Sequence, residues 1–174
     1  MIVVLDATTL ISLGTIGELN LLTAFSGDLV VLPAIDAEVT TEPARTNLER
    51  FVETHDVTTS EAVAAEHLST AQTVLEESEP TGDVWVLAAV LGRTADDRPV
   101  AVVSDDRRVR TTARGLGATV TGTIGVVVNA VDRGLDPADA RRLVDRLDAQ
   151  GLHMTGSLRA KADDLIAAAS ESSE

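Results

Sequence analysis

The stretch VAVVSDDRRVRTTARG (100–115) joins an apolar run to a polar segment that opens with two adjacent aspartates. Because an unbroken run rich in β-branched residues is typical of a strand covered on both faces, VAVV (100–103) predicts a central strand of a parallel sheet. The polar segment has helical spacing, and Gly115 is suited to a C-cap. The stretch therefore predicts a strand followed by a helix, the repeating unit of an α/β fold.

Similar apolar runs occur elsewhere and predict three more strands, at IVVL (2–5), LVVL (29–32) and ATVTG (118–122). Helical patterns lie between the runs. The segments with helical spacing are 16–25, 33–39, 60–77 with Ser60 as N-cap, and 83–92 with Gly92 as C-cap. This alternation predicts an α/β fold with a parallel sheet.

After residue 122 the pattern becomes helical throughout. One apolar helix is expected to close at Gly134, a second to begin after Asp136, and a third to cover TGSLRAKADDLIAAAS. No repeat and no long linker divides the chain. We therefore expect one domain spanning 1–174, with an α/β core (1–122), C-terminal helices (123–170) and a polar tail (171–174).

The chain of 174 residues is strongly acidic, with 28 Asp and Glu against 14 Lys and Arg and a net charge of −14. Lys161 is its one lysine. This composition is typical of halophilic proteins, whose carboxylate surfaces stay hydrated in salt. A net negative charge argues against generic nucleic-acid binding, but strong salt screens that repulsion, so local charge clusters are more informative.

Other features of the composition exclude whole classes of protein. Without cysteine, the chain has neither disulfides nor thiolate metal sites. No apolar run is long enough to cross a bilayer, and the first ten residues lack the basic segment of a signal peptide. We therefore expect a soluble cytoplasmic protein that does not associate with membranes.

Acidic residues follow two of the predicted strands directly. Asp6 comes after IVVL, and Asp105 and Asp106 come after VAVVS. If these strands are neighbours where the strand order reverses, their carboxylates converge, and Glu38 and Asp83 are placed to join them. Such a cluster needs a cation, and oxygen ligands suit Mg²⁺ or Mn²⁺, which polarise a phosphodiester. The alternative is that each acid is a turn or cap residue, or in the case of Glu38 part of a solvated helix face.

Four segments carry a resemblance to a known family. The chain resembles PIN-domain proteins, which have the nuclease fold of the VapC-like toxins and of related stand-alone archaeal and bacterial proteins. The C-terminal helices also resemble those of one PIN subfamily. The matching segments are VVLDATTLISLGTIGELNLL (3–22), VLPAIDAEV (31–39), TGDVWVLAAV (81–90) and VVSDDRRVRTTARGLGATVTGTIGVV (102–127).

The resemblance implies a three-layer sandwich with a central parallel sheet of four to five strands and extra C-terminal helices. It also implies that carboxylates bind one or two divalent ions, Mg²⁺ or Mn²⁺, for hydrolysis of RNA. Asp6, Glu38 and Asp83 match the first three acids of the family. For the fourth, alignment of Ser104 with a Thr/Ser-x-Asp pattern selects Asp106, whereas the subfamily-like spacing selects Asp105, which is slightly preferred.

Two further groups of polar residues have open roles. Thr8 either hydrogen-bonds Asp6 or a metal-bound water, or caps a helix that begins near Thr9. On a helix starting at Asp106, three arginines share one face that a phosphate backbone could contact. These residues are Arg107, Arg110 and Arg114. The alternatives are that they pair with surface acids, or that Arg107 or Arg108 pairs with the adjacent aspartates.

The expected function is that of a divalent-metal-dependent endoribonuclease, the toxin of a type II toxin–antitoxin pair. The alternative is a non-catalytic PIN-fold module for binding or assembly. The resemblance implies a homodimer and an antitoxin protein that inserts Arg or Lys near Asp6, with helices in 10–25 and 44–76 receiving the partner. Replacing Asp6 by Asn is expected to leave the metal-free stability unchanged or raised, because repulsion is relieved.

Overall fold

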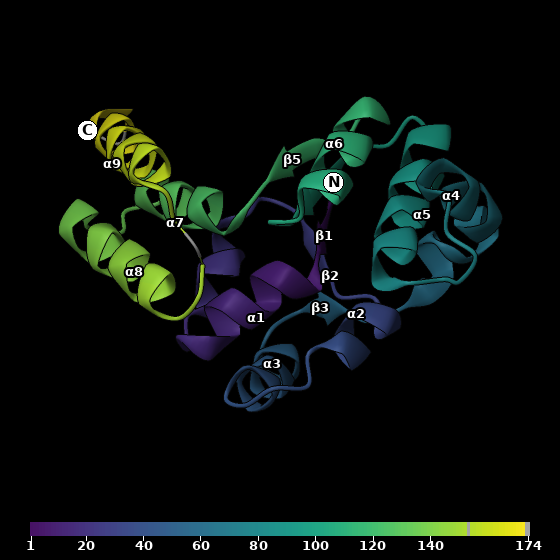
Figure 1. Ribbon diagram of the computed structural model, residues 1–174, viewed down its shortest axis with the longest axis horizontal. Helices are drawn as coiled ribbons and strands as arrows, with labels where there is room; N and C mark the ends of the chain where they lie inside the picture. Colours follow the sequence, from purple (N-terminus) through teal and green to yellow (C-terminus); the bar gives the residue numbers. More distant parts are fainter. Residues whose placement is uncertain (153, 173–174) are drawn as a thin grey trace.

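A parallel sheet of five strands forms the centre of the molecule (Figure 1). The computed structural model describes residues 1–152 and 154–172. The strand order is β3-β2-β1-β4-β5, and every neighbouring pair is parallel. The strands are β1 (Ile2–Leu5), β2 (Asp28–Val30), β3 (Val57–Thr58), β4 (Val100–Val103) and β5 (Thr119–Thr121).

Helices cover both faces of this sheet, which gives the predicted three-layer α/β sandwich. Three short 3₁₀ helices accompany them, η1 (Leu19–Ala24), η2 (Glu61–Val63) and η3 (Ala65–His67). The α-helices are α1 (Ala7–Thr15), α2 (Pro33–Glu38), α3 (Ala44–Thr54), α4 (Leu68–Leu75), α5 (Gly82–Ala95), α6 (Arg107–Gly115), α7 (Thr123–Asp132), α8 (Pro137–Ala149) and α9 (Gly156–Ser172).

The helices pack as two layers. α4, α5 and α6 pack together on one side of the sheet, whereas α1 contacts α3 and α7 on the other side (Figure 1). The C-terminal helices α7, α8 and α9 pack against one another, and α7 also contacts η1, so they extend the second layer. The two central strands β1 and β4 are fully buried, as their unbroken apolar runs predict.

Several element boundaries differ from the prediction. The helix expected over 16–25 is the 3₁₀ helix η1. α1 ends before Gly17, since a residue with a φ of +75° cannot be part of an α-helix. The helix expected over 60–77 is two 3₁₀ helices followed by α4, although Ser60 does cap the first of them. The helix α5 passes through Gly92 without ending there.

Two other differences concern the edge strand of the sheet and the last helix. β3 was not predicted, because a strand of two residues has no periodicity to detect. The polar tail expected at 171–174 begins as helix, since α9 continues to Ser172, and residues 173–174 lie outside the described part of the chain.

The order in which the chain connects the strands determines where the candidate site lies. The chain builds β1, β2 and β3 outward in one direction and then crosses back to β4 and β5 on the other side of β1. The carboxyl ends of β1 and β4 are therefore adjacent, and the backbone N–H of Asp6 donates to the carbonyl of Val103 at 3.0 Å. Ligands of open α/β sheets bind at such a reversal of strand order.

Candidate active site

Asp6 lies at the end of β1 and is almost completely buried, with 2% of its surface exposed. Its Oδ1 accepts a hydrogen bond from the backbone N–H of Ala7 at 2.8 Å, which makes it the N-cap of α1. Its Oδ2 accepts from the hydroxyl of Thr8 at 2.8 Å and from that of Ser104 at 2.5 Å. Three donors therefore satisfy this buried carboxylate and hold its position.

The two hydroxyls also bind the loop between β4 and α6. Thr8 Oγ1 accepts the backbone N–H of Asp105 at 3.1 Å, and Ser104 Oγ accepts that of Asp106 at 3.0 Å. Each hydroxyl thus donates to Asp6 and accepts from the loop. Thr8 has the first of its two predicted roles, since Asp6 and not Thr8 caps α1.

The adjacent aspartates of the loop point to different places. Asp106 caps α6 by accepting the backbone N–H of Val109 at 2.9 Å. The carboxylate of Asp105 turns toward α7, where it accepts the backbone N–H of Thr123 at 2.9 Å and also the Thr123 hydroxyl. The oxygens of Asp105 are therefore engaged at the start of α7, and the choice between Asp105 and Asp106 as the fourth acid stays a prediction.

Glu38 approaches the same region from the end of α2. Its Oε1 accepts the backbone N–H of Gly82, the first residue of α5, at 3.0 Å. A Cβ atom on Gly82 would lie only 2.2 Å from this oxygen, so the contact requires glycine there. Gly82 is a site residue that the sequence analysis missed, and its only signal was its place directly before Asp83.

Asp83, the second residue of α5, shows that the acids act on one another. Its pKa is raised from 3.8 to about 6, first by burial and then by the negative charges of Asp6, Asp106 and Glu38. Asp105 is not among the largest of these influences. The charge at the start of α5 is thus influenced by acids from three other places, which are the end of β1, the end of α2 and the β4–α6 loop.

One arginine opposes this negative charge. Arg108 lowers the pKa of Asp83, although less than the other influences raise it. Its guanidinium donates to Glu77 Oε1 at 2.7 Å and to the carbonyl of Leu75, so it is attached to the end of α4. Arg108 was not predicted as a site residue from sequence, because helical spacing places the other three arginines of α6 on a common face.

Those three arginines differ in their surroundings. Arg107 and Arg114 are exposed in the first and last turns of α6. Arg110 is partly buried, and its Nε has no hydrogen-bond partner in residues 1–152 and 154–172. Within those residues none of the three forms an ion pair, so the alternative of pairing with surface acids is not realised there.

Comparison with known proteins agrees with this arrangement. A family model described as "DUF3368: PIN domain" matches residues 2–167, nearly the whole chain. The chain belongs to the PIN-domain family. PIN domains have a nuclease fold, generally act as nucleases on RNA and typically use divalent metals. A search of curated proteins found no match.

The donor chemistry of this PIN domain fits a hard divalent cation. The groups that face one another are carboxylates, and Mg²⁺ and Mn²⁺ prefer oxygen ligands. The pKa of Asp83 is raised first by burial and then by negative charge, which Arg108 offsets only in part. As the side chains stand, however, no three Asp, Glu or His residues of the described chain are close enough to hold one ion together.

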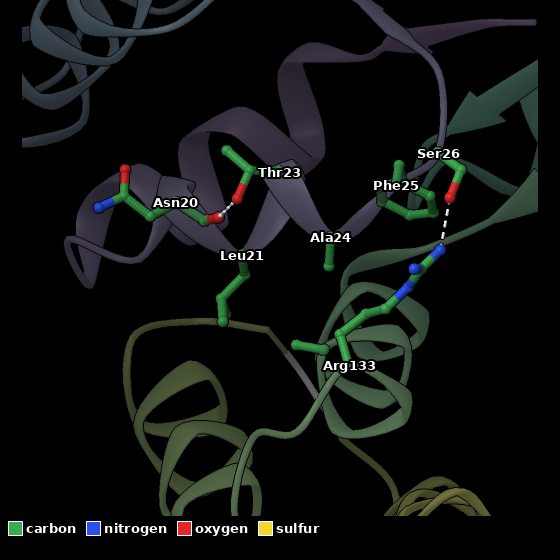
Figure 2. Close-up of a pocket in the computed structure, with 8 residues that line it drawn as sticks. Asn20, Leu21, Thr23, Ala24, Phe25, Ser26 and Arg133 are labelled. Carbon is green, nitrogen blue, oxygen red and sulfur yellow. Dashed lines mark hydrogen bonds between the residues drawn. The ribbon is translucent and has the colours of Figure 1, made fainter. Parts of the chain in front are cut away.

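Another hollow of the PIN domain lies away from these acids. Figure 2 shows this pocket of about 400 Å³ between η1 and α7, where Arg133 donates to the hydroxyl of Ser26. Ser26 precedes β2, so the pocket lies at the amino-terminal edge of the sheet, opposite the carboxylates. None of its lining residues is acidic. No helix in the described residues is long and apolar enough to span a membrane.

Proposed function

We propose that this PIN domain is a divalent-metal-dependent endoribonuclease that hydrolyses RNA phosphodiester bonds at Asp6, Glu38, Asp83 and Asp106. The observation that carries the proposal is the pKa of Asp83, raised to about 6 in part by the charges of the other three acids. Groups with strongly shifted pKa values cluster at functional sites. The four acids lie where the strand order reverses, which is where ligands of open α/β sheets bind. Membership of a nuclease family supports the same function.

The four acids have different parts in this proposal. Asp83, Asp106 and Glu38 would bind Mg²⁺ or Mn²⁺, which supplies Lewis-acid polarisation of the phosphodiester when bound. Asp6 keeps an acceptor site beyond its three hydrogen bonds and orients the β4–α6 loop through Thr8 and Ser104. In the metal-free protein Asp83 has a pKa of about 6, so at neutral pH its carboxyl is mostly deprotonated and able to bind a cation.

The proposal is tested by cleavage of a fluorescently labelled single-stranded RNA at low and molar KCl. Cleavage is expected with Mg²⁺ or Mn²⁺, is abolished by EDTA, and falls at least about 100-fold in Asp83→Asn, the range for loss of an electrostatic or acid–base group. The matched control is Asp28→Asn, an exposed aspartate at the start of β2. Equal cleavage by Asp83→Asn and the wild-type protein would refute the proposed site.

A binding module without catalysis is the second candidate function. The specific observation in its favour is that no three carboxylates of the described residues converge on one point as they stand. A folded protein that binds labelled RNA but leaves it intact in Mg²⁺, Mn²⁺ and molar KCl would establish this alternative.

We also propose the two partners that the family resemblance implies. A homodimer through the helices of 10–25 and 44–76 predicts twice the chain mass in light scattering, and a monomer at high concentration in molar salt would exclude it. A toxin with an antitoxin predicts that expression stops growth unless the adjacent gene is expressed as well. Growth and RNA cleavage that do not depend on that gene would exclude an antitoxin.

A further inference from the structure

A pocket of about 360 Å³ lies beside the carboxylates, bounded by α6, the start of α7 and α9. Its volume is at the lower end of the range of small-molecule sites. Asp105 lines the pocket on the side that faces Asp6. The backbone N–H of Asp105 donates to the hydroxyl of Thr8, and this hydroxyl donates to Asp6. The pocket therefore adjoins the hydrogen-bond network of the proposed active site.

The pocket combines apolar walls with two cations and one carboxylate, that of Asp105. Leu158 and Leu165 on α9 are 39% and 41% exposed, and they are among the few large apolar side chains of the described residues left in solvent. Two cations, Arg110 and Lys161, line the same hollow. The apolar lining is completed by Ile124 and Leu152.

Both cations are available to a ligand. Within residues 1–152 and 154–172 neither Arg110 nor Lys161 forms an ion pair, whereas six other arginines do. Arg110 Nε is buried without a hydrogen-bond partner in the same residues. In a protein of net charge −14, two unpaired cations beside exposed leucines favour an anionic ligand that has an apolar face.

We propose that this pocket holds one nucleotide of the RNA strand whose phosphodiester lies at the carboxylates, an inference that rests on the proposed ribonuclease function. Arg110 and Lys161 contact the phosphate, and the leucines of α9 pack against the base. A base has a flat apolar face, which proteins bind between aromatic or aliphatic side chains. Packing of the base against aliphatic side chains suits this chain, which has one Trp, two Phe and no Tyr.

The test measures steady-state cleavage of a labelled RNA by Lys161→Ala, Arg110→Ala and Leu165→Glu at one fixed KCl concentration. Each variant is expected to raise KM about three- to tenfold with kcat retained, because the pocket binds a part of the strand that does not react. Arg98→Ala is the control for charge, since Arg98 is exposed at the amino end of β4. Val74→Glu is the control for Leu165→Glu, since Val74 is 42% exposed on α4.

Substrates with one abasic nucleotide locate the occupant. An abasic nucleotide at one fixed position should raise KM for the wild-type protein and have no further effect in Leu165→Glu, as expected for two changes that remove one contact. Pocket variants that cleave every substrate as well as the controls do would overturn the inference and leave the ribonuclease function standing.

Absence of cleavage by the wild-type protein would instead refute the ribonuclease function. The pocket is then tested alone by NMR titration with adenosine 5′-monophosphate and, separately, inorganic phosphate, observing the amides of Gly122 and Gly125, which line it. Saturable shifts with the nucleotide that Leu165→Glu abolishes would support a nucleotide site. No shifts with the nucleotide, or equal shifts with phosphate, would overturn it.

Discussion

At the scale of single residues, burial decides what each carboxylate does. Asp6 is enclosed and accepts three hydrogen bonds, two of them from hydroxyls that also accept backbone N–H groups of the β4–α6 loop. Asp83 is half-buried, and this burial, followed by the negative charges of the neighbouring acids, raises its pKa to about 6. Neighbouring acids of one site thus differ, since Asp6 holds the loop through hydrogen bonds and Asp83 has a raised pKa.

Replacing Asp6 by Asn should destabilise the metal-free protein by about 1–3 kcal/mol, because an amide has one acceptor oxygen, so either the two hydroxyls or the backbone N–H of Ala7 must face the NH2 group. The expectation from sequence is the opposite, namely that relief of repulsion leaves the metal-free stability unchanged or raised, and the measurement distinguishes the two. Urea unfolding measures the effect, with Asp28→Asn expected within about 0.5 kcal/mol of wild type. An Asp6→Asn variant as stable as the wild-type protein would mean that these hydrogen bonds contribute little.

Replacing Asp83 by Asn should have the opposite effect, and only above acidic pH. Since the folded protein binds this proton more tightly than the unfolded chain, the carboxylate lowers stability progressively as pH rises from 3.8 toward about 6. The half-exposed position limits the gain of Asp83→Asn at pH 7 to about 1 kcal/mol. Urea unfolding of both proteins at pH 4 to 7 in EDTA measures it, and a difference that does not vary with pH would contradict it.

At the scale of elements, the site is assembled where helix ends meet strand ends. The last residue of α2 reaches the first residue of α5, and α6 is tied to the end of α4 by Arg108. Each junction depends on a close contact between segments far apart in the chain. Changes at these junctions should therefore alter the site while the sheet stays folded.

Gly82→Ala should displace Glu38, because the new Cβ would lie 2.2 Å from Glu38 Oε1. We expect Mn²⁺ binding to weaken about tenfold, equivalent to about 1.4 kcal/mol, which is near the lower end of the range for a hydrogen bond to a charged group. Calorimetric titration with Mn²⁺ measures it. Gly115→Ala is the matched control, since a Cβ there meets nothing within 4 Å, and equal affinities of the two variants would refute the role of Gly82.

Arg108→Gln should raise the pKa of Asp83 above about 6, because it removes a positive charge that lowers it. The carboxyl carbon of Asp83, followed by NMR from pH 4 to 8 in EDTA, reports this pKa directly. Arg107→Gln removes the same charge from the preceding, exposed position and should leave the titration nearly unchanged. Identical titrations in the two variants would show that Arg108 does not act on the site.

At the scale of the whole molecule, net charge opposes compactness. The protein carries a charge of −14, and eight ion pairs among the described residues engage six of its 14 cations. Most of the surface acids have no cationic partner in those pairs. Self-repulsion of this kind destabilises the folded state and is screened by salt.

Stability should therefore rise with salt, as the acidic composition predicts for a halophilic protein. Between 0.1 and 2 M KCl we expect Tm to increase by more than about 2–4 °C, the shift equivalent to 1 kcal/mol for a chain of this size. Thermal unfolding followed by circular dichroism measures it. Sucrose at matched osmolality separates charge screening from solvent exclusion, and a Tm that does not change with KCl would contradict the prediction.

The sequence by itself determined the two central strands and the position of the acids that follow them. IVVL and VAVV predict buried strands because short apolar runs rich in β-branched residues are typical of strands covered on both faces. β1 and β4 occupy these residues, and Asp6, Asp105 and Asp106 follow their ends. The local signal is sufficient here because strand formation and the direction of the chain depend on neighbouring residues.

Only the tertiary structure decided which side chains face one another. Asp105 and Asp106 are equivalent in the sequence, but Asp105 finds its donors on Thr123 at the start of α7 while Asp106 contributes to the field at Asp83. Asp6 and Ser104, 98 positions apart, hydrogen-bond because β1 and β4 are neighbours in the sheet. The direction of a side chain is set by partners that packing brings together, and no local pattern of residues contains that information.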